Sequence, residues 1–184
     1  MSRPALFLDR DGVINVDHGY VHTPEEFQFI DGIFDLVSAA NRSGYLVVVV
    51  TNQAGIGRGY YSEAQFHALT DWMKTKFAEH GEKIDAVYFC PHHPTEGLGI
   101  YRQDCNCRKP APGMLLTARH DLDINLIKSI FVGDSLKDVQ AADEAGIRQI
   151  YMLQANKMFS TEIANCSQIS NLASVVLRLT SNQR

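Results

Sequence analysis

The stretch that decides the fold is Ala5-Leu6-Phe7-Leu8-Asp9-Arg10-Asp11-Gly12-Val13-Ile14-Asn15, a short apolar run that ends in two aspartates one residue apart. Residues 5–8 are typical of a buried central strand. Because strand side chains alternate between faces, Asp9 and Asp11 are expected to point to one side where the strand ends, and Gly12 lets the chain turn away. Two like charges this close need a cation or a proton, and Mg²⁺ prefers carboxylate oxygens. The alternative for an isolated Asp-x-Asp is a plain polar turn.

The composition is that of an ordinary globular protein. The chain has 184 residues, of which 45% are hydrophobic and 21% are charged, so we expect a single domain over residues 1–184. The net charge of −4 and the pI near 5.9 argue against a protein that binds nucleic acid or another extended polyanion. Any anionic substrate is expected to be small and held by local cations.

The sequence indicates neither a membrane span nor a signal peptide. The start Met1-Ser2-Arg3-Pro4 leads directly into the first predicted strand, and no apolar run approaches the length of a bilayer crossing. We expect a cytoplasmic protein that contacts no membrane. In a reducing compartment Cys90, Cys105 and Cys107 are expected to be metal ligands rather than disulfides, whereas Cys166 stands apart as a buried or inert thiol.

Apolar runs alternate with helical periodicities along most of the chain. The further predicted strands are residues 45–50, 85–90, 129–133 and 149–153. The predicted helices lie near residues 33–40, 62–77, 114–120, 139–145 and 172–179, and the second of them begins with a capping box, Ser62-Glu63-Ala64-Gln65. The polar segment between residue 153 and the last helix receives no element. This alternation predicts an α/β fold, a doubly wound, Rossmann-like parallel sheet.

Polar groups follow several of these strands. After residues 45–50, Thr51 supplies a hydroxyl, nearby glycines free backbone N–H groups, and Arg58 supplies a cation, a combination that suits phosphate oxygens. Because the carboxyl ends of parallel strands meet at one edge of a sheet, we expect a metal-dependent phosphate site there. The residues expected to meet are Asp9, Asp11, Thr51, Lys109 and Asp134.

The polar segment 16–24 directly follows the acidic strand end. It is either a substrate loop or a plain connection, and we weigh the two equally. His18 and Tyr20 are its candidate substrate contacts.

Four ligands for a second metal lie after the third strand. Cys90, His92, Cys105 and Cys107 form two close pairs, a donor set that fits one tetrahedral Zn²⁺. All four positions are protein ligands, so the zinc is expected to be structural and to fold the loop 90–107, which we call the zinc loop. His93 is an alternative to His92, and a reduced cysteine cluster without metal is the alternative to a zinc site.

Two cations follow the last cysteine, in Arg108-Lys109-Pro110. A pair of this kind is usually solvated surface, but a metal on one side and prolines on the other constrain it. We therefore expect the zinc loop to fix where Arg108 and Lys109 project toward an anion.

The order of these groups along the chain, an acid, a hydroxyl, a lysine and a second acid, resembles the motif order of the haloacid dehalogenase (HAD) superfamily of phosphotransferases. The matching strings are Leu8-Asp9-Arg10-Asp11-Gly12, Val50-Thr51-Asn52, Arg108-Lys109-Pro110 and Gly133-Asp134-Ser135-Leu136-Lys137-Asp138. The resemblance spans residues 5 to about 153 and implies an HAD-like phosphatase. Too few residues separate these motifs for a large cap domain, so we expect a capless, open site in which the zinc loop acts as a lid.

Within the superfamily, the chain is most similar to the D-glycero-D-manno-heptose-1,7-bisphosphate 7-phosphatase family. The strings that carry this are Asp17-His18-Gly19-Tyr20-Val21, Thr51-Asn52-Gln53, Cys90-Pro91-His92-His93-Pro94 and Cys105-Asn106-Cys107-Arg108-Lys109-Pro110. The resemblance implies a small phosphorylated sugar as substrate and a place in lipopolysaccharide precursor synthesis. Ala54 and Ser135 stand where the family pattern has Ser and Lys, which puts the substrate contact at position 135 in question.

The resemblance also implies residue roles. Asp9 would attack phosphorus and form an aspartyl-phosphate, and Asp11 would protonate the leaving oxygen and later deprotonate water. Thr51 and Lys109 would hold the phosphoryl oxygens. Mg²⁺ would be held by Asp9, the backbone carbonyl of Asp11, and Asp134, with almost no turnover in its absence. The expected substrate contacts are Asp17, His18, Gly19, Tyr20, Thr51, Asn52, Gln53, Ala54, Arg108, Lys109 and Ser135.

Other functions fit parts of the pattern. Histidinol-phosphate phosphatases resemble the chain at the zinc loop and at Arg108-Lys109-Pro110, and DNA 3′-phosphatases share the Thr51-Asn52-Gln53 stretch, although no basic stripe for a nucleic acid is evident. A zinc-stabilised module that binds phosphorylated ligands without catalysis is the alternative from another class, and the two carboxylates Asp9 and Asp11 argue against it. We expect a monomer, since no long apolar seam remains after the core helices are assigned.

Overall fold

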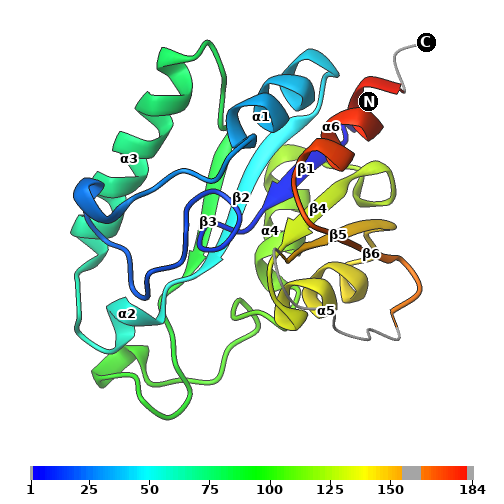
Figure 1. Ribbon diagram of the computed structural model, residues 1–184. Coiled ribbons are helices and arrows are strands. Elements are labelled where there is room, and N and C mark those ends of the chain that lie inside the picture. The colour runs from blue at the N-terminus through cyan, green and yellow to red at the C-terminus, as the bar shows by residue number, and fades with distance from the viewer. Residues whose placement is uncertain (1, 155–162, 182–184) are drawn as a thin grey trace.

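The computed structural model describes residues 2–154 and 163–181. Its centre is a sheet of six strands in the order β3-β2-β1-β4-β5-β6, and each neighbouring pair is parallel (Figure 1). The strands are β1 Ala5–Leu8, β2 Leu46–Asn52, β3 Ala86–Cys90, β4 Ile130–Gly133, β5 Gln149–Leu153 and β6 Cys166–Ile169. The predicted doubly wound parallel sheet is confirmed.

Helices cover both faces of the sheet (Figure 1). They are α1 Ile33–Arg42, α2 Ala54–Gly57, α3 Glu63–Glu79, α4 Gly113–Leu122, α5 Leu136–Glu144 and α6 Ala173–Ser181, with short 3-10 turns at Pro24–Glu26, Gly99–Tyr101 and Leu126–Lys128. Buried residues of α1, α3 and α6 pack with one face, and those of α4 and α5 with the other. The capping box at Ser62 is confirmed, because its side chain accepts a hydrogen bond from Gln65 N.

The central strand β1 shows why this sequence folds as it does. Leu6 and Leu8 pack into one core, Ala5 and Phe7 into the other, and all four are fully buried. A strand covered on both faces needs no polar alternation. Each large side chain contributes roughly 1.5–3 kcal/mol by leaving water, so β1 is anchored and its carboxyl end is held in place.

Two strands differ from the sequence prediction. β2 continues through Thr51 and Asn52, because these residues pair with Phe89 and Cys90 of β3. β6 was not predicted: its residues Cys166–Ile169 include exposed polar side chains, and the segment joins the sheet by parallel pairing with β5. Cys166, expected to be a buried or inert thiol, lies half-buried in this edge strand.

The strand order reverses between β1 and β4, the place where an open parallel sheet leaves a crevice beyond its carboxyl ends. Among residues 2–154 no separate domain is inserted between these elements, as expected for a capless fold. No helix in the described part of the chain has the length and apolar content that crossing a bilayer requires.

Candidate functional site

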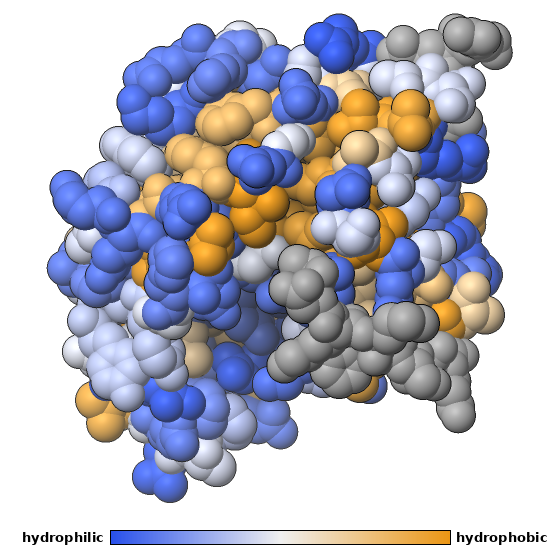
Figure 2. All heavy atoms as spheres, viewed as in Figure 1, coloured by the Kyte–Doolittle hydropathy of each residue, from blue (hydrophilic) through white to orange (hydrophobic). Residues whose placement is uncertain are grey.

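A cavity of about 630 Å³ lies at this crevice. In the space-filling view hydrophilic residues surround a hollow between α2 and α5 (Figure 2). Among its lining residues are those predicted for catalysis and substrate binding: Asp9, Asp11, Asp17, Gly19, Tyr20, Thr51, Asn52, Gln53, Ala54, Arg108, Lys109, Asp134 and Ser135. His18 is exposed and is not among the residues that line the cavity, so its contact with substrate stays a prediction.

Lys109 lies at the centre of the acidic cluster. Its Nζ lies 2.9 Å from Asp9 Oδ1 and 2.6 Å from Asp138 Oδ1, and it donates a hydrogen bond to Val50 O at 2.9 Å. Lys109 and Asp138 are almost completely buried. Burial alone would lower the pKa of Lys109, but Asp138 and Asp9 raise that pKa above its ordinary value. Lys109 is therefore a permanent cation that holds two carboxylates together.

The backbone of Lys109 is fixed by Asn52. The Asn52 amide donates to Lys109 O and accepts from Lys109 N, both at 3.0 Å. Asn52 is expected from the sequence to contact substrate, and its side chain does line the cavity. Its two hydrogen bonds also position the backbone of Lys109.

The carboxylates are arranged for a divalent cation. Carboxylate oxygens of Asp9, Asp134 and Asp138 all lie within 4.8 Å of one another. Burial, then the charge of Asp138, raises the pKa of Asp134 to about 7, and the same two causes raise the pKa of Asp9 well above its usual range. One lysine does not neutralise the group, so the donor set fits a hard cation such as Mg²⁺.

Asp138 has a different role from the other two acids. Its Oδ2 accepts from the Ser135 hydroxyl at 2.6 Å and from Ser135 N at 3.1 Å, as part of a capping box that begins α5. Although burial acts in the other direction, Lys109 lowers the pKa of Asp138. The hydroxyl of Ser135 is thus bound to Asp138, and Asp138 orients Lys109.

The carboxylate of Asp11 does not join the metal-binding group. It accepts hydrogen bonds from Asn15 Nδ2 at 3.0 Å, Gln53 Nε2 at 2.9 Å and the Arg10 guanidinium. The backbone carbonyl of Asp11 stays the predicted magnesium ligand, and the carboxylate is held separately by N–H groups of Arg10, Asn15 and Gln53.

Arg10 and Asn15 were missed by sequence reasoning. Arg10 is only 2% exposed although it carries a charge. A strand continuing through residues 9–11 would have placed Arg10 opposite both aspartates, but β1 ends at Leu8. The turn beyond it brings the guanidinium onto Asp11. The available signal was the position of an arginine between two catalytic acids.

Gln53, expected to contact substrate, also links several residues of the site. Its Nε2 donates to Asp11 Oδ2 and to Thr51 Oγ1, and its Oε1 accepts from the Tyr61 hydroxyl. Gln53 and Thr51 are both at least 98% buried. The Thr-x-Gln spacing at the end of β2 therefore links the Thr51 hydroxyl to the Asp11 carboxylate through one amide.

The backbone at position 12 passes so close to the Asp134 side chain that a glycine is required there. Gly12 has φ +90°, and a Cβ at this position would lie 2.0 Å from Asp134 Oδ2. Only glycine lets the turn after Asp11 pass so near the second metal-binding acid. The position of this glycine is therefore fixed by the site.

The cavity rim opposite Lys109 is aromatic and basic. Tyr20, on the loop expected to contact substrate, makes an edge-on contact with Tyr60, and Arg58 lies 5.7 Å from the Tyr20 ring centroid. Arg58 also forms an ion pair with Glu96 of the zinc loop. These contacts join the substrate loop, the segment after α2 and the zinc loop around one opening.

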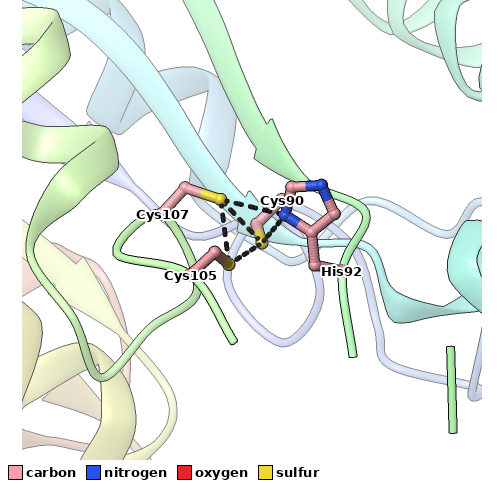
Figure 3. A group of neighbouring side chains, drawn as sticks. All are labelled: Cys90, His92, Cys105 and Cys107. Carbon is pink, nitrogen blue, oxygen red and sulfur yellow. Dashed lines mark hydrogen bonds between the residues drawn. The ribbon is translucent and has the colours of Figure 1, made fainter. Parts of the chain in front are cut away.

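The zinc ligands form one cluster (Figure 3). The sulfurs of Cys90, Cys105 and Cys107 lie 3.0–3.5 Å apart, and His92 Nδ1 lies 3.4 Å from Cys107 Sγ and 3.7 Å from Cys90 Sγ. A tetrahedral Zn²⁺ with bonds of about 2.3 Å places its sulfurs roughly 3.8 Å apart. The set is therefore compatible with zinc. His93 lies outside it and accepts from Glu96 N instead.

The zinc loop is joined mechanically to the cavity. Arg108 Nη1 donates to the carbonyl of His92 at 3.1 Å, so a zinc ligand fixes a cavity cation. On the other side, a Cβ at Gly57 would lie 2.4 Å from Pro91 O. The predicted coupling between the zinc loop and the basic residues has a direct path through Arg108.

We predict that zinc removal loosens this coupling. Elemental analysis should find about one zinc per chain. Cys107→Ser should lower the Tm by at least about 4 °C, since a chain of this size shifts by roughly 2–4 °C per kcal/mol, and should raise KM several-fold because Arg108 loses its support. Cys166→Ser, outside the cluster, is the control. Unchanged Tm and KM in Cys107→Ser would contradict a structural zinc.

The sequence and structure are similar to those of known proteins. A family model described as HAD-hydrolase-like matches residues 106–164. A D-glycero-beta-D-manno-heptose-1,7-bisphosphate 7-phosphatase from Vibrio cholerae is 49% identical over 177 residues, covering 96% of this chain and 92% of that protein. A D-glycero-alpha-D-manno-heptose-1,7-bisphosphate 7-phosphatase from Burkholderia mallei is 51% identical over 178 residues, covering 97% and 90%.

The chain is also similar to a solved structure that contains a bound metal. The D,D-heptose 1,7-bisphosphate phosphatase from B. bronchiseptica, complexed with magnesium and phosphate, matches with a TM-score of 0.83 and 32% identity, over 97% of this chain and 99% of that one.

Proposed function

The chain belongs to the D-glycero-D-manno-heptose-1,7-bisphosphate 7-phosphatase family of the HAD superfamily, and we propose that Asp9 is the nucleophile with which it removes the 7-phosphate. The chain is a magnesium-dependent phosphoric monoester hydrolase. The observation that carries this assignment is near 50% identity to such phosphatases over almost the whole chain.

The proposed reaction begins at Asp9. Its carboxylate oxygen forms a bond to phosphorus, the bond from phosphorus to the sugar oxygen breaks, and Asp11 gives that oxygen its proton. In the second step Asp11 takes a proton from water, and the resulting hydroxide attacks the aspartyl-phosphate and frees Asp9. Asp11 lines the same cavity as Asp9, which supports this division of work.

Charge on the phosphoryl oxygens is the main barrier to attack by a carboxylate. In the proposed mechanism Lys109 and the Thr51 hydroxyl stabilise the charge that spreads over these oxygens, and both residues line the cavity. Asp9, Asp134 and the carbonyl of Asp11 would hold magnesium, which would supply positive charge that offsets the negative charge of the phosphate.

The second phosphate of the substrate explains the basic rim. We propose that Arg108 and Arg58 contact it, because both line the cavity outside the acidic cluster. The loop residues Asp17, Gly19 and Tyr20 and the backbone at Ala54 would then contact the sugar. The single domain, the monomeric state and the cytoplasmic location stay predictions of the sequence.

A substrate panel tests this function. With Mg²⁺ present, phosphate release from heptose 1,7-bisphosphate should exceed that from histidinol phosphate or from a DNA 3′-phosphate by at least about 10²-fold in kcat/KM. Histidinol phosphate offers the rim no second phosphate, and the net charge of −4 disfavours the binding of a DNA backbone. Both anomers belong in the panel, since relatives are named for each. Faster release from histidinol phosphate would overturn the sugar assignment, and equal release in excess chelator would overturn the magnesium requirement.

A further inference from the structure

We propose that Arg10 is a positioning residue: its buried guanidinium sets the place of the Asp11 carboxylate from which both proton transfers occur. The inference rests on the proposed role of Asp11 and adds a residue that is outside the metal-binding acids. Arg10 does not line the cavity, so it acts through the residues that it contacts and not on the substrate directly.

The contact between the two residues is bidentate in character. Arg10 Nη2 lies 3.0 Å from both Asp11 carboxylate oxygens, and Nε lies 3.3 Å from Oδ1 and 3.2 Å from Oδ2. A planar guanidinium with two donors on one carboxylate fixes its direction as well as its distance. Among the described residues, Asn15 and Gln53 are the other donors to this carboxylate, and only Arg10 carries a charge.

Arg10 itself is held from two further sides. Nη2 donates to the carbonyl of Val21 at 2.7 Å, and the guanidinium lies 5.8 Å from the centroid of the Phe66 ring on α3. Val21 lies in the loop 16–24, whose residues Asp17, Gly19 and Tyr20 line the cavity. The acid that transfers protons is therefore tied through one nitrogen to the loop expected to contact the sugar.

A second route joins the same loop to Asp11. The His22 ring stacks on Tyr61 with centroids 5.1 Å apart, Tyr61 donates to Gln53, and Gln53 donates to Asp11. The loop therefore contacts Arg10 directly through Val21, and it reaches Gln53 through Tyr61. Arg10 supplies a charged donor to the Asp11 carboxylate, and Gln53 supplies a neutral one.

Stability does not account for Arg10. Its Nη1 is buried without a hydrogen-bond partner among the described residues, and a buried charge with an unpaired donor carries a desolvation penalty. Replacing a buried ion pair by apolar groups is often neutral for stability. The arrangement is better explained by the geometry it imposes on Asp11.

The test is a double-mutant cycle between Arg10→Met and Asp11→Asn. Because Arg10 acts through Asp11, Arg10→Met should lower kcat on the sugar bisphosphate about 10²-fold, near the lower end of what proton transfer contributes. It should change KM less than about threefold and add almost nothing in the Asp11→Asn background. Arg178→Met, on the exposed side of α6, is the matched control.

A second readout separates the two chemical steps. p-Nitrophenyl phosphate has a leaving group that needs no proton, so Arg10→Met should still phosphorylate Asp9 at near the normal rate. The slow second step should then appear as a burst of about one nitrophenolate per chain. If Arg10→Met does not fold, Arg10→Lys replaces it in the double-mutant cycle, because lysine keeps the charge but lacks the planar pair of donors.

The outcomes distinguish this inference from the function on which it rests. Losses that multiply in the double variant, or a change confined to KM, would overturn the role of Arg10 while leaving that of Asp11 intact. Full turnover of Asp11→Asn would overturn both. Loss of activity in Arg10→Met with no nitrophenolate burst would also count against a role in proton transfer.

Discussion

Asp9→Asn is expected to abolish phosphate release, with kcat reduced by more than about 10⁴-fold, as for other lost nucleophiles. The amide cannot form the covalent bond to phosphorus, and the remaining groups bind the substrate without a route to products. Lys109 and Thr51 keep their places, so substrate binding should survive. Measurements of phosphate release and of equilibrium substrate binding check both parts.

The fold should tolerate this change. Asp9 is about 9% exposed, and burial followed by the charge of Asp138 raises its pKa, so a neutral amide of the same shape removes an unfavourable charge. Asp71→Asn, exposed on α3, is the control for the chemical change alone. Full turnover of Asp9→Asn, or a trapped phosphoryl group on another residue of the wild type, would contradict the nucleophile assignment.

Lys109→Met is expected to lower both activity and stability. Removing the cation leaves Asp9 and the buried Asp138 facing each other unpaired, and breaking a buried pair in this way costs about 3–5 kcal/mol. The phosphoryl oxygens also lose a positive charge, which should reduce kcat by about 10²–10³-fold or more. Urea unfolding and phosphate release measure the two effects.

A second substitution separates stability from catalysis. Asp138→Asn in the Lys109→Met background removes one unpaired charge, so it should recover a large part of the unfolding free energy and none of the activity. Lys128→Met, on an exposed turn, controls for the loss of a lysine. Normal stability of Lys109→Met would show that the lysine does not hold the two acids together.

Much of the fold could be predicted because its strands are buried on both faces. β1 and β4 are runs of apolar residues with no polar alternation, a pattern typical of parallel sheets. β6 could not be predicted in this way, because half of its side chains are exposed and its pairing with β5 is made by backbone. The extension of β2 through Asn52 likewise depends on pairing with β3.

The candidate site shows the same division. Residues at strand ends, such as Asp9, Thr51 and Asp134, could be placed in one cavity from topology, because parallel strands deliver their carboxyl ends to one edge. Which residues of the loop 16–24 line the cavity could not be predicted, because that depends on how the loop turns: Asp17, Gly19 and Tyr20 line it and His18 does not. Arg10 could not be found, because only the turn after Leu8 brings its guanidinium onto Asp11.

The amino-acid sequence by itself determined the parallel sheet, the acids at its edge and the four zinc ligands, because apolar periodicity and ligand chemistry are local properties. Only the tertiary structure decided what each polar group does: Asn52 and Asp138 fix Lys109, and Gln53 and Arg10 fix Asp11. The physical reason is that a buried polar group must find its partners across the fold, and those partners come from segments whose approach no local pattern contains.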